Sequence, residues 1–502
     1  MNKKIVIMII CLCGILTACS YKEFFRQYQR ALSGAAIDGG ENSGQVKETK
    51  KETAATSSSV MGDIVTGSGI HSADNVTMDM QTADYWIDRI NSPDKILANQ
   101  KEIENYNKKI KKQMSQDSDA LFFDVDSYDE SIAGYRLKEL MGENGFTLKP
   151  YTNSQGESIA SEQWQIYFEN CNYDSIADFN KVRYGVVCRR ADVRVLPTAE
   201  RIFDNSDKQS GDVLQSTALA VNEPVLVMHT SRDNGWYFIV AEEYAGWVSC
   251  DAIGLAASRN EWQKIRENEH FLVVTGDRIQ TQEVPGDELS GNYEFTMGTK
   301  LPLAENAAWK DLKSKSGDEN SVCNSSVYDS YVVKAPKRNE DGSLTYAMLA
   351  VPLNKDVSIG YMEYTRANVL RQAFKMLGNP YGWGGADSGR DCSSLVRDVY
   401  LCFGFRLPRN SSDMAKLPES VDVKELSEKE IIQKLMGTES GSILQMPGHV
   451  MLYLGCVDKN YFVLSARGGK FQRVMINDLH AQTGDGRNWA AQLETIINLM
   501  SS

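Results

Sequence analysis

The stretch NPYGWGGADSGRDCSSL, residues 379–395, joins a run of turn-forming residues to a cysteine and an apolar pattern. Gly, Asn, Asp and Ser dominate the stretch up to Asp391, and apolar residues then recur at helical spacing. The pattern predicts a helix that follows Asp391 and ends at Gly404, with its apolar face formed by Leu395, Val396, Val399, Tyr400 and Phe403. Cys392 is therefore expected at the N-terminus of this helix.

The predicted position of Cys392 suits a nucleophile. Backbone N–H groups and the partial positive charge of a helix N-terminus favour the thiolate, which is the reactive form of cysteine. The preceding glycines let backbone approach a substrate closely, because they have no Cβ. Position alone leaves two alternatives open, a reactive thiol or a small structural residue. Cys402 and Cys456, expected within the helix and after a strand, are interpreted as inert apolar residues.

A cysteine nucleophile needs a base, and histidine is the usual one. The chain has five histidines, at positions 71, 229, 270, 449 and 480. The last two fall in the same region as Cys392. His449 begins the apolar run HVMLYLG, which predicts a strand, whereas His480 lies in a region without a regular pattern and is expected at the surface. We therefore pair Cys392 with His449.

The remaining sequence predicts several domains, as expected for 502 residues. Short strands separated by Asn, Gly, Asp and Pro turns predict a small β-barrel over residues 184–256, whose end resembles a bacterial SH3 domain, and a second barrel over 257–358. Both are interpreted equally as ligand-binding modules or as spacers. Residues 76–183 form an N-terminal helical region that braces the others, and Ile96, Ile103 and Ile110 recur there at near-helical intervals after Pro93. Residues 359–502 mix helices and strands.

The first residues, MNKKIVIMIICLCGILTAC, read as a secretory signal over residues 1–18. The closing LTAC resembles a bacterial lipobox, in which Cys19 is lipidated; an uncleaved anchor is the alternative. Residues 19–75 are small, polar and charged, which predicts a flexible tether. We therefore expect a lipid-anchored protein of the bacterial envelope, at the outer membrane if the cell has one, with its body in the periplasm or outside the cell membrane.

Composition excludes some partners and metals. A net charge of -13 argues against binding to nucleic acid, which requires a basic face. Ten cysteines, less Cys11, Cys13 and Cys19, leave seven, an odd number with no CxxC spacing that would indicate a zinc site. No metal and no organic cofactor is predicted, and the oligomeric state stays open.

Three motifs carry a family resemblance: NPYGWGG…RDCSSL, LPRNSSDMA and GHVMLYLG. Together they resemble the NlpC family of papain-like cell-wall cysteine peptidases. The resemblance implies an α+β papain-like catalytic domain, preceded here by two SH3-like barrels and the helical segment. It implies Cys392 as nucleophile and His449 as base, with Tyr381 helping to stabilise the oxyanion. By the same resemblance, Asp391 and Ser393 grip the peptide substrate.

The chain departs from the family pattern at the third polar residue. The family often has a histidine there that orients the base, in a segment like YxxHA, whereas this chain has YFVLSA with Ser465 at that place. A serine hydroxyl is shorter and neutral, so it should stabilise an imidazolium less well. A bridging water, lowered activity, or substitution by His480 are the alternatives.

The family hydrolyses amide bonds of peptidoglycan, commonly between γ-D-glutamate and a diamino acid. The resemblance thus implies a cysteine endopeptidase that acts on stem peptides or muropeptides. Two alternatives remain. One is a weakened catalytic domain that serves as a wall-binding lipoprotein, and the other is a thiol acyltransferase or lipid-directed amidase on the same scaffold.

Overall fold

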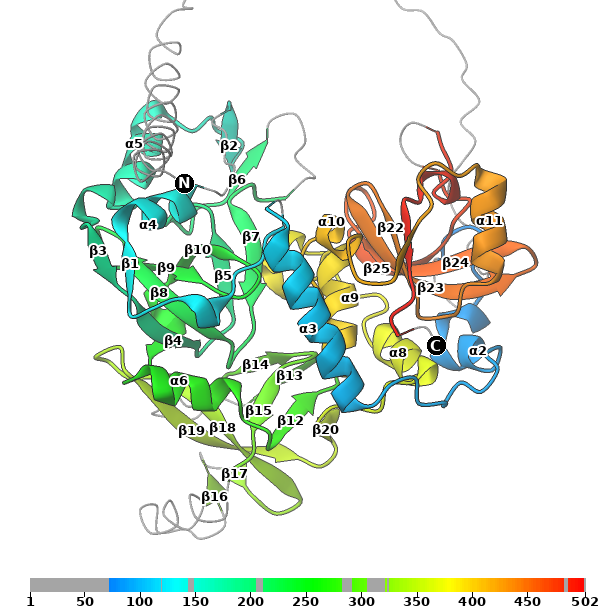
Figure 1. Ribbon diagram of the computed structural model, residues 1–502, viewed down its shortest axis with the longest axis horizontal. Helices are drawn as coiled ribbons and strands as arrows, with labels where there is room; N and C mark the ends of the chain where they lie inside the picture. Colours follow the sequence, from blue (N-terminus) through cyan, green and yellow to red (C-terminus); the bar gives the residue numbers. More distant parts are fainter. Residues whose placement is uncertain are drawn as a thin grey trace, which may run out of the picture.

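The computed structural model describes residues 72–118, 120–142, 149–204, 211–281, 291–304, 321–322, 325–482 and 486–500. Figure 1 shows two lobes with helix α3 (Gln100–Gln116) running between them. One lobe holds the strand-rich middle of the chain and the other holds the C-terminal sheet and its helices. In these described residues no helix combines the length and the apolar character needed to cross a membrane. Cys19 and the predicted signal and tether, up to residue 71, lie outside the described residues.

The C-terminal domain is built on a six-stranded sheet in the order β21-β26-β22-β23-β24-β25. Helices α8 and α9 pack on one face of this sheet and share a core with its central strands, in which Val396 and Leu452 are fully buried. α11 and Trp489 cover the opposite face. The bounds are α8 Arg366–Phe374, α9 Cys392–Leu401, α10 Ser411–Met414, α11 Glu428–Met436, β21 Ser420–Asp422, β22 Ile443–Met446, β23 His449–Val457, β24 Asn460–Arg467, β25 Arg473–Asp478 and β26 Thr495–Ile497.

A seven-stranded antiparallel sheet in the order β11-β4-β8-β9-β10-β5-β7 occupies residues 183–255. Its core contains Phe238 and Trp247, which lie edge to face with ring centroids 5.5 Å apart. The strands are β4 Arg183–Val187, β5 Ala191–Arg194, β7 Gln215–Leu219, β8 Pro224–Thr230, β9 Trp236–Val240, β10 Ala245–Ser249 and β11 Ile253–Leu255. This sheet falls within the predicted first barrel.

The described residues between 259 and 359 include helix α6 and several small sheets, whose strands share an apolar cluster that includes Leu272, Phe295 and Leu349. Helix α6 instead packs on the seven-stranded sheet through Trp262. β12 pairs with β15 and β20, β13 with β14, β16 with β17, and β18 with β19. A second barrel stays a prediction, because residues 282–290 and 305–320 are not described. The bounds are α6 Arg259–Arg266, β12 Phe271–Val274, β13 Arg278–Gln280, β14 Glu294–Thr296, β15 Lys300–Pro302, β16 Ser321–Val322, β17 Ser325–Ser326, β18 Ser330–Arg338, β19 Leu344–Pro352 and β20 Val357–Ile359.

The region predicted as one bracing unit, 76–183, divides between two cores. Helices α2 (Ala83–Ile87) and α3 pack into the core of the C-terminal domain, where Tyr106 donates a hydrogen bond to the Pro418 carbonyl at 2.7 Å. The later elements pack with the seven-stranded sheet. These are β1 Ser131–Ala133, α4 Gly134–Gly142, β2 Tyr151–Asn153, which pairs with β6 Ile202–Asp204, α5 Ser161–Asn170 and β3 Phe179–Lys181.

The isoleucine pattern of this region was only partly right. Ile103 and Ile110 are buried on α3, which begins after an Asn99 cap that bonds reciprocally with Glu102. Ile96 precedes the cap and is 52% exposed, so it does not belong to the helical face. The spacing was near-helical, but the capping box begins the helix after it.

Candidate active site

Cys392 is the first residue of α9, and Asp391 caps the helix. The Asp391 carboxylate accepts a hydrogen bond from the Ser394 backbone N–H at 2.9 Å, and the Ser394 hydroxyl accepts one from the Asp391 N–H at 3.0 Å. This reciprocal capping satisfies two donors that a helix end otherwise leaves free. The thiol is thereby held at the start of α9, where the turn-rich stretch placed it.

A buried ion pair fixes the cap. Arg409 donates to both carboxylate oxygens of Asp391, at 2.6 and 3.1 Å, and to the Ser393 hydroxyl at 2.8 Å. Its Nε reaches the Thr217 hydroxyl of the seven-stranded sheet at 2.8 Å. Burial alone raises the pKa of Asp391, but the charge and hydrogen bonds of Arg409 outweigh it and hold that pKa below its ordinary value. The carboxylate is therefore ionised at neutral pH.

Arg409 and Thr217 were missed by the sequence interpretation. Arg409 stands in the motif LPRNSSDMA, and its presence there was the available signal. An arginine that is 5% exposed needs a carboxylate partner, but the motif does not reveal which one. Thr217 gave no signal, because it lies almost two hundred residues away.

The glycine-rich turn before α9 contacts another domain. The Trp383 indole donates to the Gln215 carbonyl at 3.1 Å, and the Gln215 side chain donates to the Gly384 carbonyl at 3.0 Å. Gly384 and Gly385 have φ values of 56° and 76°, and a Cβ on Gly384 would lie 2.9 Å from the Gln215 side chain. The close approach to a substrate that was expected of the glycines stays a prediction, and for Gly384 and Gly385 the close contact observed is with another domain. They let the turn fit against β7.

The thiol environment differs from the one expected for a bare helix N-terminus. Cys392 is partly exposed, yet burial of its thiol and the charge of Asp391 raise its pKa to about 12. A backbone hydrogen bond from Val450, the residue after His449, acts in the opposite direction. Desolvation and the acidic neighbour therefore favour the neutral thiol.

Tyr381 lies in the same neighbourhood. Burial raises the pKa of its hydroxyl, and the nearby Asp391 and Cys392 add to this effect. A Cβ on Gly468 would meet the Tyr381 ring at 3.2 Å, so the loop after β24 packs against this tyrosine. Tyr381 is thus a neutral hydroxyl close to the thiol.

His449 is the first residue of β23, as the HVMLYLG run predicted. Its ring meets the edge of Trp489 at a centroid distance of 5.3 Å. Burial, and secondarily the charge of Arg467, lower the pKa of His449 to about 4. Nε2 is buried and has no hydrogen-bond partner, and no hydrogen bond joins the imidazole to the Cys392 thiol. The structure brings the two together through Val450 rather than by a direct bond.

Ser465 lies on β24, which pairs antiparallel with β23. Leu452 is opposite Leu464, so continuing this register places His449 opposite Arg467 and diagonal to Ser465. Ser465 is fully buried and its hydroxyl has no hydrogen-bond partner. Side chains at diagonal positions on neighbouring strands are several ångströms apart, and a histidine ring at position 465 could span that distance to His449 whereas the serine hydroxyl is too short. The short side chain of Ser465 therefore explains why its Oγ and the Nε2 of His449 both lack a hydrogen-bond partner.

The other candidates lie apart from the thiol. His480 is exposed and bonds Asp478 at 2.9 Å. Cys402 caps the C-terminus of α9 rather than lying within it, and Cys456 is an exposed residue of β23 rather than one that follows it. Six described cysteines are free thiols, and Cys323 lies outside the described residues.

Residues 378–491 match the NlpC/P60 family. The chain carries an NlpC/P60 domain. A second match, to the SH3 domain of the SH3b1 type, covers residues 201–249 and confirms the SH3-like prediction for the first of the two barrels. The resemblance stated from the motifs is likewise confirmed at the level of these two domains.

Known proteins share the NlpC/P60 part. The chain is 34% identical over 118 residues to dipeptidyl-peptidase 6 of Lysinibacillus sphaericus, covering 23% of this chain and 38% of that protein. It is 27% identical over 100 residues to gamma-D-glutamyl-L-lysine dipeptidyl-peptidase of Bacillus subtilis (strain 168), covering 20% of this chain and 32% of that protein. The chain thus matches about a third of the length of these relatives.

A solved structure extends the likeness beyond one domain. An NlpC/P60 endopeptidase from Photobacterium damselae subsp. piscicida superposes with a TM-score of 0.64 at 19% identity. The match covers 85% of this chain and 98% of the other. The shared fold therefore includes the regions before the NlpC/P60 domain as well as that domain.

Proposed function

We propose that this protein is a cysteine endopeptidase that cleaves peptidoglycan stem peptides between γ-D-glutamate and the diamino acid. The observation that carries the proposal is a capped cysteine at the start of α9, beside the strand that begins with His449, within an NlpC/P60 domain. One of the relatives is named for this type of bond, as a gamma-D-glutamyl-L-lysine dipeptidyl-peptidase. Peptidoglycan stem peptides and released muropeptides are the proposed partners.

The chemistry follows from the neutral pair. The pKa values of about 12 for Cys392 and about 4 for His449 leave both groups uncharged before substrate binds. Nε2 is buried, so Nδ1 is the ring nitrogen available to accept the thiol proton. The sulfur attacks the carbonyl carbon, and the oxyanion is stabilised by Tyr381 and the Cys392 N–H. His449 returns the proton to the leaving amine, and water opens the acyl-enzyme.

Arg467 supports a carboxylate on the leaving side. It ends β24, stacks on Phe471 and Trp489 at 3.8 and 4.5 Å, and forms no ion pair with a described acidic residue. The diamino acid departs next to His449 and carries a carboxylate. We expect Arg467→Met to raise KM several-fold for a tripeptide with a free C-terminus, and much less for its C-terminal amide. Equal effects on both substrates would contradict this assignment.

The deciding experiment compares the intact protein with Cys392→Ala on a stem tripeptide and on sacculi, with products identified by mass spectrometry. We expect cleavage at the γ-D-glutamyl bond by the intact protein and none by the variant. Cleavage at another amide would contradict the proposed bond, and cleavage by Cys392→Ala would contradict the thiol mechanism.

The second candidate is a catalytically weakened wall-binding protein, and the unpartnered Nε2 of His449 and Oγ of Ser465 favour it. When no neighbouring group orients the histidine base, its protonated imidazolium form is less well stabilised. Sacculi that are bound but left uncut by the intact protein would establish this candidate.

Anchoring at the envelope through a lipid on Cys19 is proposed on the LTAC sequence alone. Labelling of cells with a fatty-acid analogue tests it. We expect label in the intact protein and none in Cys19→Ala.

A further inference from the structure

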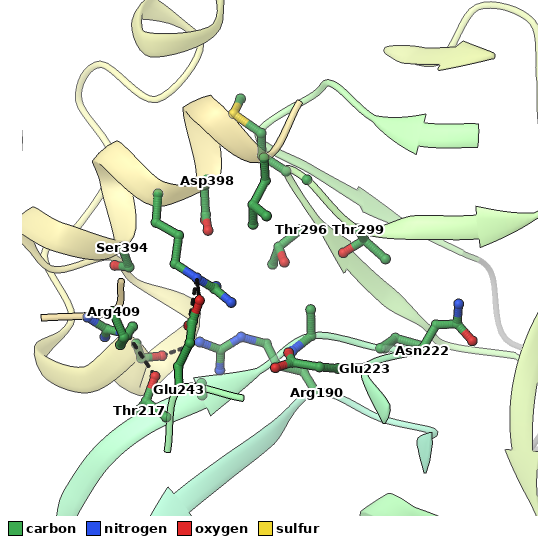
Figure 2. A pocket seen from close by; sticks show the side chains of 18 of the residues that line it. Arg190, Thr217, Asn222, Glu223, Glu243, Thr296, Thr299, Ser394, Asp398 and Arg409 are labelled. Carbon is green, nitrogen blue, oxygen red and sulfur yellow. Dashed lines mark hydrogen bonds and ion pairs between the residues drawn. The ribbon is translucent and has the colours of Figure 1, made fainter. Parts of the chain in front are cut away.

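A cavity of about 210 Å³ lies between the seven-stranded sheet, the β12–β20 region and α9. Its lining includes Ser394, Arg397 and Asp398 of α9 but neither Cys392 nor His449. Figure 2 shows Arg190, Glu223, Thr296 and Thr299 around one open space. The cavity therefore does not contain the proposed nucleophile or base, although it borders the candidate active site through α9, Thr217, Gly385 and Arg409.

One side of the cavity has unused hydrogen-bond acceptors. The Glu223 carboxylate accepts one hydrogen bond, from the Ala220 N–H at 3.1 Å, and no described cation lies within ion-pair distance. Thr299 is 4% exposed, and its hydroxyl is buried without a partner. The Asn222 side-chain oxygen is also unpartnered. Burial of such groups is unfavourable unless something bonds them.

The facing side has two guanidinium groups with N–H donors to spare. Arg190 bonds the Gly385 carbonyl, but its ion pairs with Asp192 and Glu294 are long, at 3.7 and 3.8 Å. Arg397 uses its Nε for Glu243 at 2.8 Å, and its terminal nitrogens have no hydrogen bond within the described residues.

Neighbouring arginines differ from these two. Arg390 uses Nε for Asp398 at 2.8 Å and both terminal nitrogens for Asp277, and Arg409 is fully bonded to Asp391, Ser393 and Thr217. Arg190 and Arg397 therefore have more unbonded N–H groups than Arg390 and Arg409. Arg266 and Arg406, which also line the cavity, form ion pairs with Asp126 and Glu242 through one terminal nitrogen each.

We propose that this cavity binds a small α-amino acid as a zwitterion, with its carboxylate at Arg190 and Arg397 and its ammonium at Glu223. Two cations and one unpaired acid form a site for one anionic and one cationic group, whereas a simple anion would leave Glu223 unpaired. A volume of about 210 Å³ is sufficient for a small amino acid such as alanine. The site needs no catalytic activity, so the proposal is independent of the proposed function.

The same contacts predict a pH dependence. Burial raises the pKa of Glu223 to about 7, with Arg397 opposing and Glu243 adding to the rise. An ammonium placed beside Glu223 favours the ionised carboxyl, so binding releases a proton near neutral pH and tightens as pH rises toward 8. The charged groups that face Glu223 or line the cavity are Arg190, Glu242, Glu243, Arg266, Lys300, Arg390, Arg397, Asp398, Arg406 and Arg409.

The test is calorimetry and thermal unfolding of the full protein with L-alanine or D-alanine as ligand. Acetate, ethylamine and inorganic phosphate serve as single-charge probes. We expect at least one alanine enantiomer to bind and to raise the unfolding temperature, with weaker binding of each single-charge probe. Glu223→Gln should weaken alanine binding roughly tenfold or more, and Thr299→Val should weaken it to a smaller extent.

Two control variants separate this site from others. Glu340→Gln replaces an exposed carboxyl outside the cavity, and Tyr381→Phe alters the candidate active site. Both should keep alanine binding. Circular dichroism establishes that each variant is folded. No binding of either enantiomer, tighter binding of phosphate or acetate, or undiminished binding by folded Glu223→Gln and Thr299→Val would each overturn the proposal.

Discussion

Replacement of Arg409 by methionine tests what holds the nucleophile's helix in place. The guanidinium and the Asp391 carboxylate are 6% and 8% exposed and lie 2.6 Å apart. Removal of one partner of such a pair leaves a buried charge without compensation, which costs about 3–5 kcal/mol. The hydrogen bonds to Ser393 and Thr217 are lost as well. We therefore expect the unfolding transition of the catalytic domain to fall by about 6–20 °C in calorimetry.

The pH dependence of this loss identifies its ionic origin. Asp391 has a folded pKa below its ordinary 3.8, so the pair's stabilisation is present above that value and is lost as pH falls through the lower folded pKa. In Arg409→Met the burial of Asp391 raises its pKa above 3.8, so the difference between the intact protein and the variant should be largest at neutral pH and shrink as pH falls toward the low folded pKa of the intact protein.

Two further variants sharpen the test. Arg371 is 46% exposed and lies 3.4 Å from an exposed Asp94, so Arg371→Met should change stability by about 0.5 kcal/mol or less. Asp391→Asn combined with Arg409→Met removes the orphaned charge and should be more stable than Arg409→Met alone. A loss below about 1 kcal/mol for Arg409→Met, or one that is equal at pH 7 and pH 3, would refute the reasoning.

Three other changes have defined outcomes. Ser465→Ala should alter kcat less than a few-fold, because the Ser465 hydroxyl has no hydrogen-bond partner, whereas Ser465→His should raise kcat by orienting His449. Steady-state kinetics on the stem tripeptide measures both effects. A large loss of kcat in Ser465→Ala would contradict the first expectation. Arg467→Met removes the positive charge that, after burial, lowers the pKa of His449. The acid limb of the kcat/KM profile, expected near pH 4, should therefore move to higher pH by up to roughly one unit. An unchanged acid limb would show that Arg467 does not act on His449. Gly211→Ala should lower the free energy of unfolding by about 1–3 kcal/mol, because φ at Gly211 is 91° and an added Cβ would lie 2.7 Å from the Cβ of Trp383. Gly486→Ala is the control in calorimetry, because φ there is 81° and an added Cβ would have no neighbour within 4 Å. An equal loss of stability in both variants would exclude the clash with Trp383.

Local sequence patterns were sufficient to predict individual helices and strands. Apolar spacing after Asp391 predicted α9, and the HVMLYLG run predicted β23 with His449 at its start. Both signals depend on residues adjacent in the chain. The family resemblance implied the α+β papain-like class, whereas the order of strands and the packing of α9 on the sheet were not predicted.

Features formed by distant segments could not be predicted in this way. The bond from Arg409 to Thr217 spans 192 residues, and the glycine turn meets a strand of another domain. The high pKa of the Cys392 thiol likewise depends on burial, which no local pattern reports. The cavity beside Glu223 draws its lining from three regions, so neither its acceptors nor its donors formed a motif.

The bonds of Arg390, Arg397 and Arg409 with other regions bear on how the segment that contains the NlpC/P60 domain can be rebuilt. Arg390 pairs with Asp277, Arg397 with Glu243, and Arg409 reaches Thr217, all outside residues 359–502. A fragment limited to residues 359–502 would expose these arginines to solvent, and Arg390 and Arg397 would lose their ion pairs with Asp277 and Glu243. A chimaera that grafts this segment onto a foreign targeting module would have to bring its original neighbours along, or replace these arginines with residues suited to water.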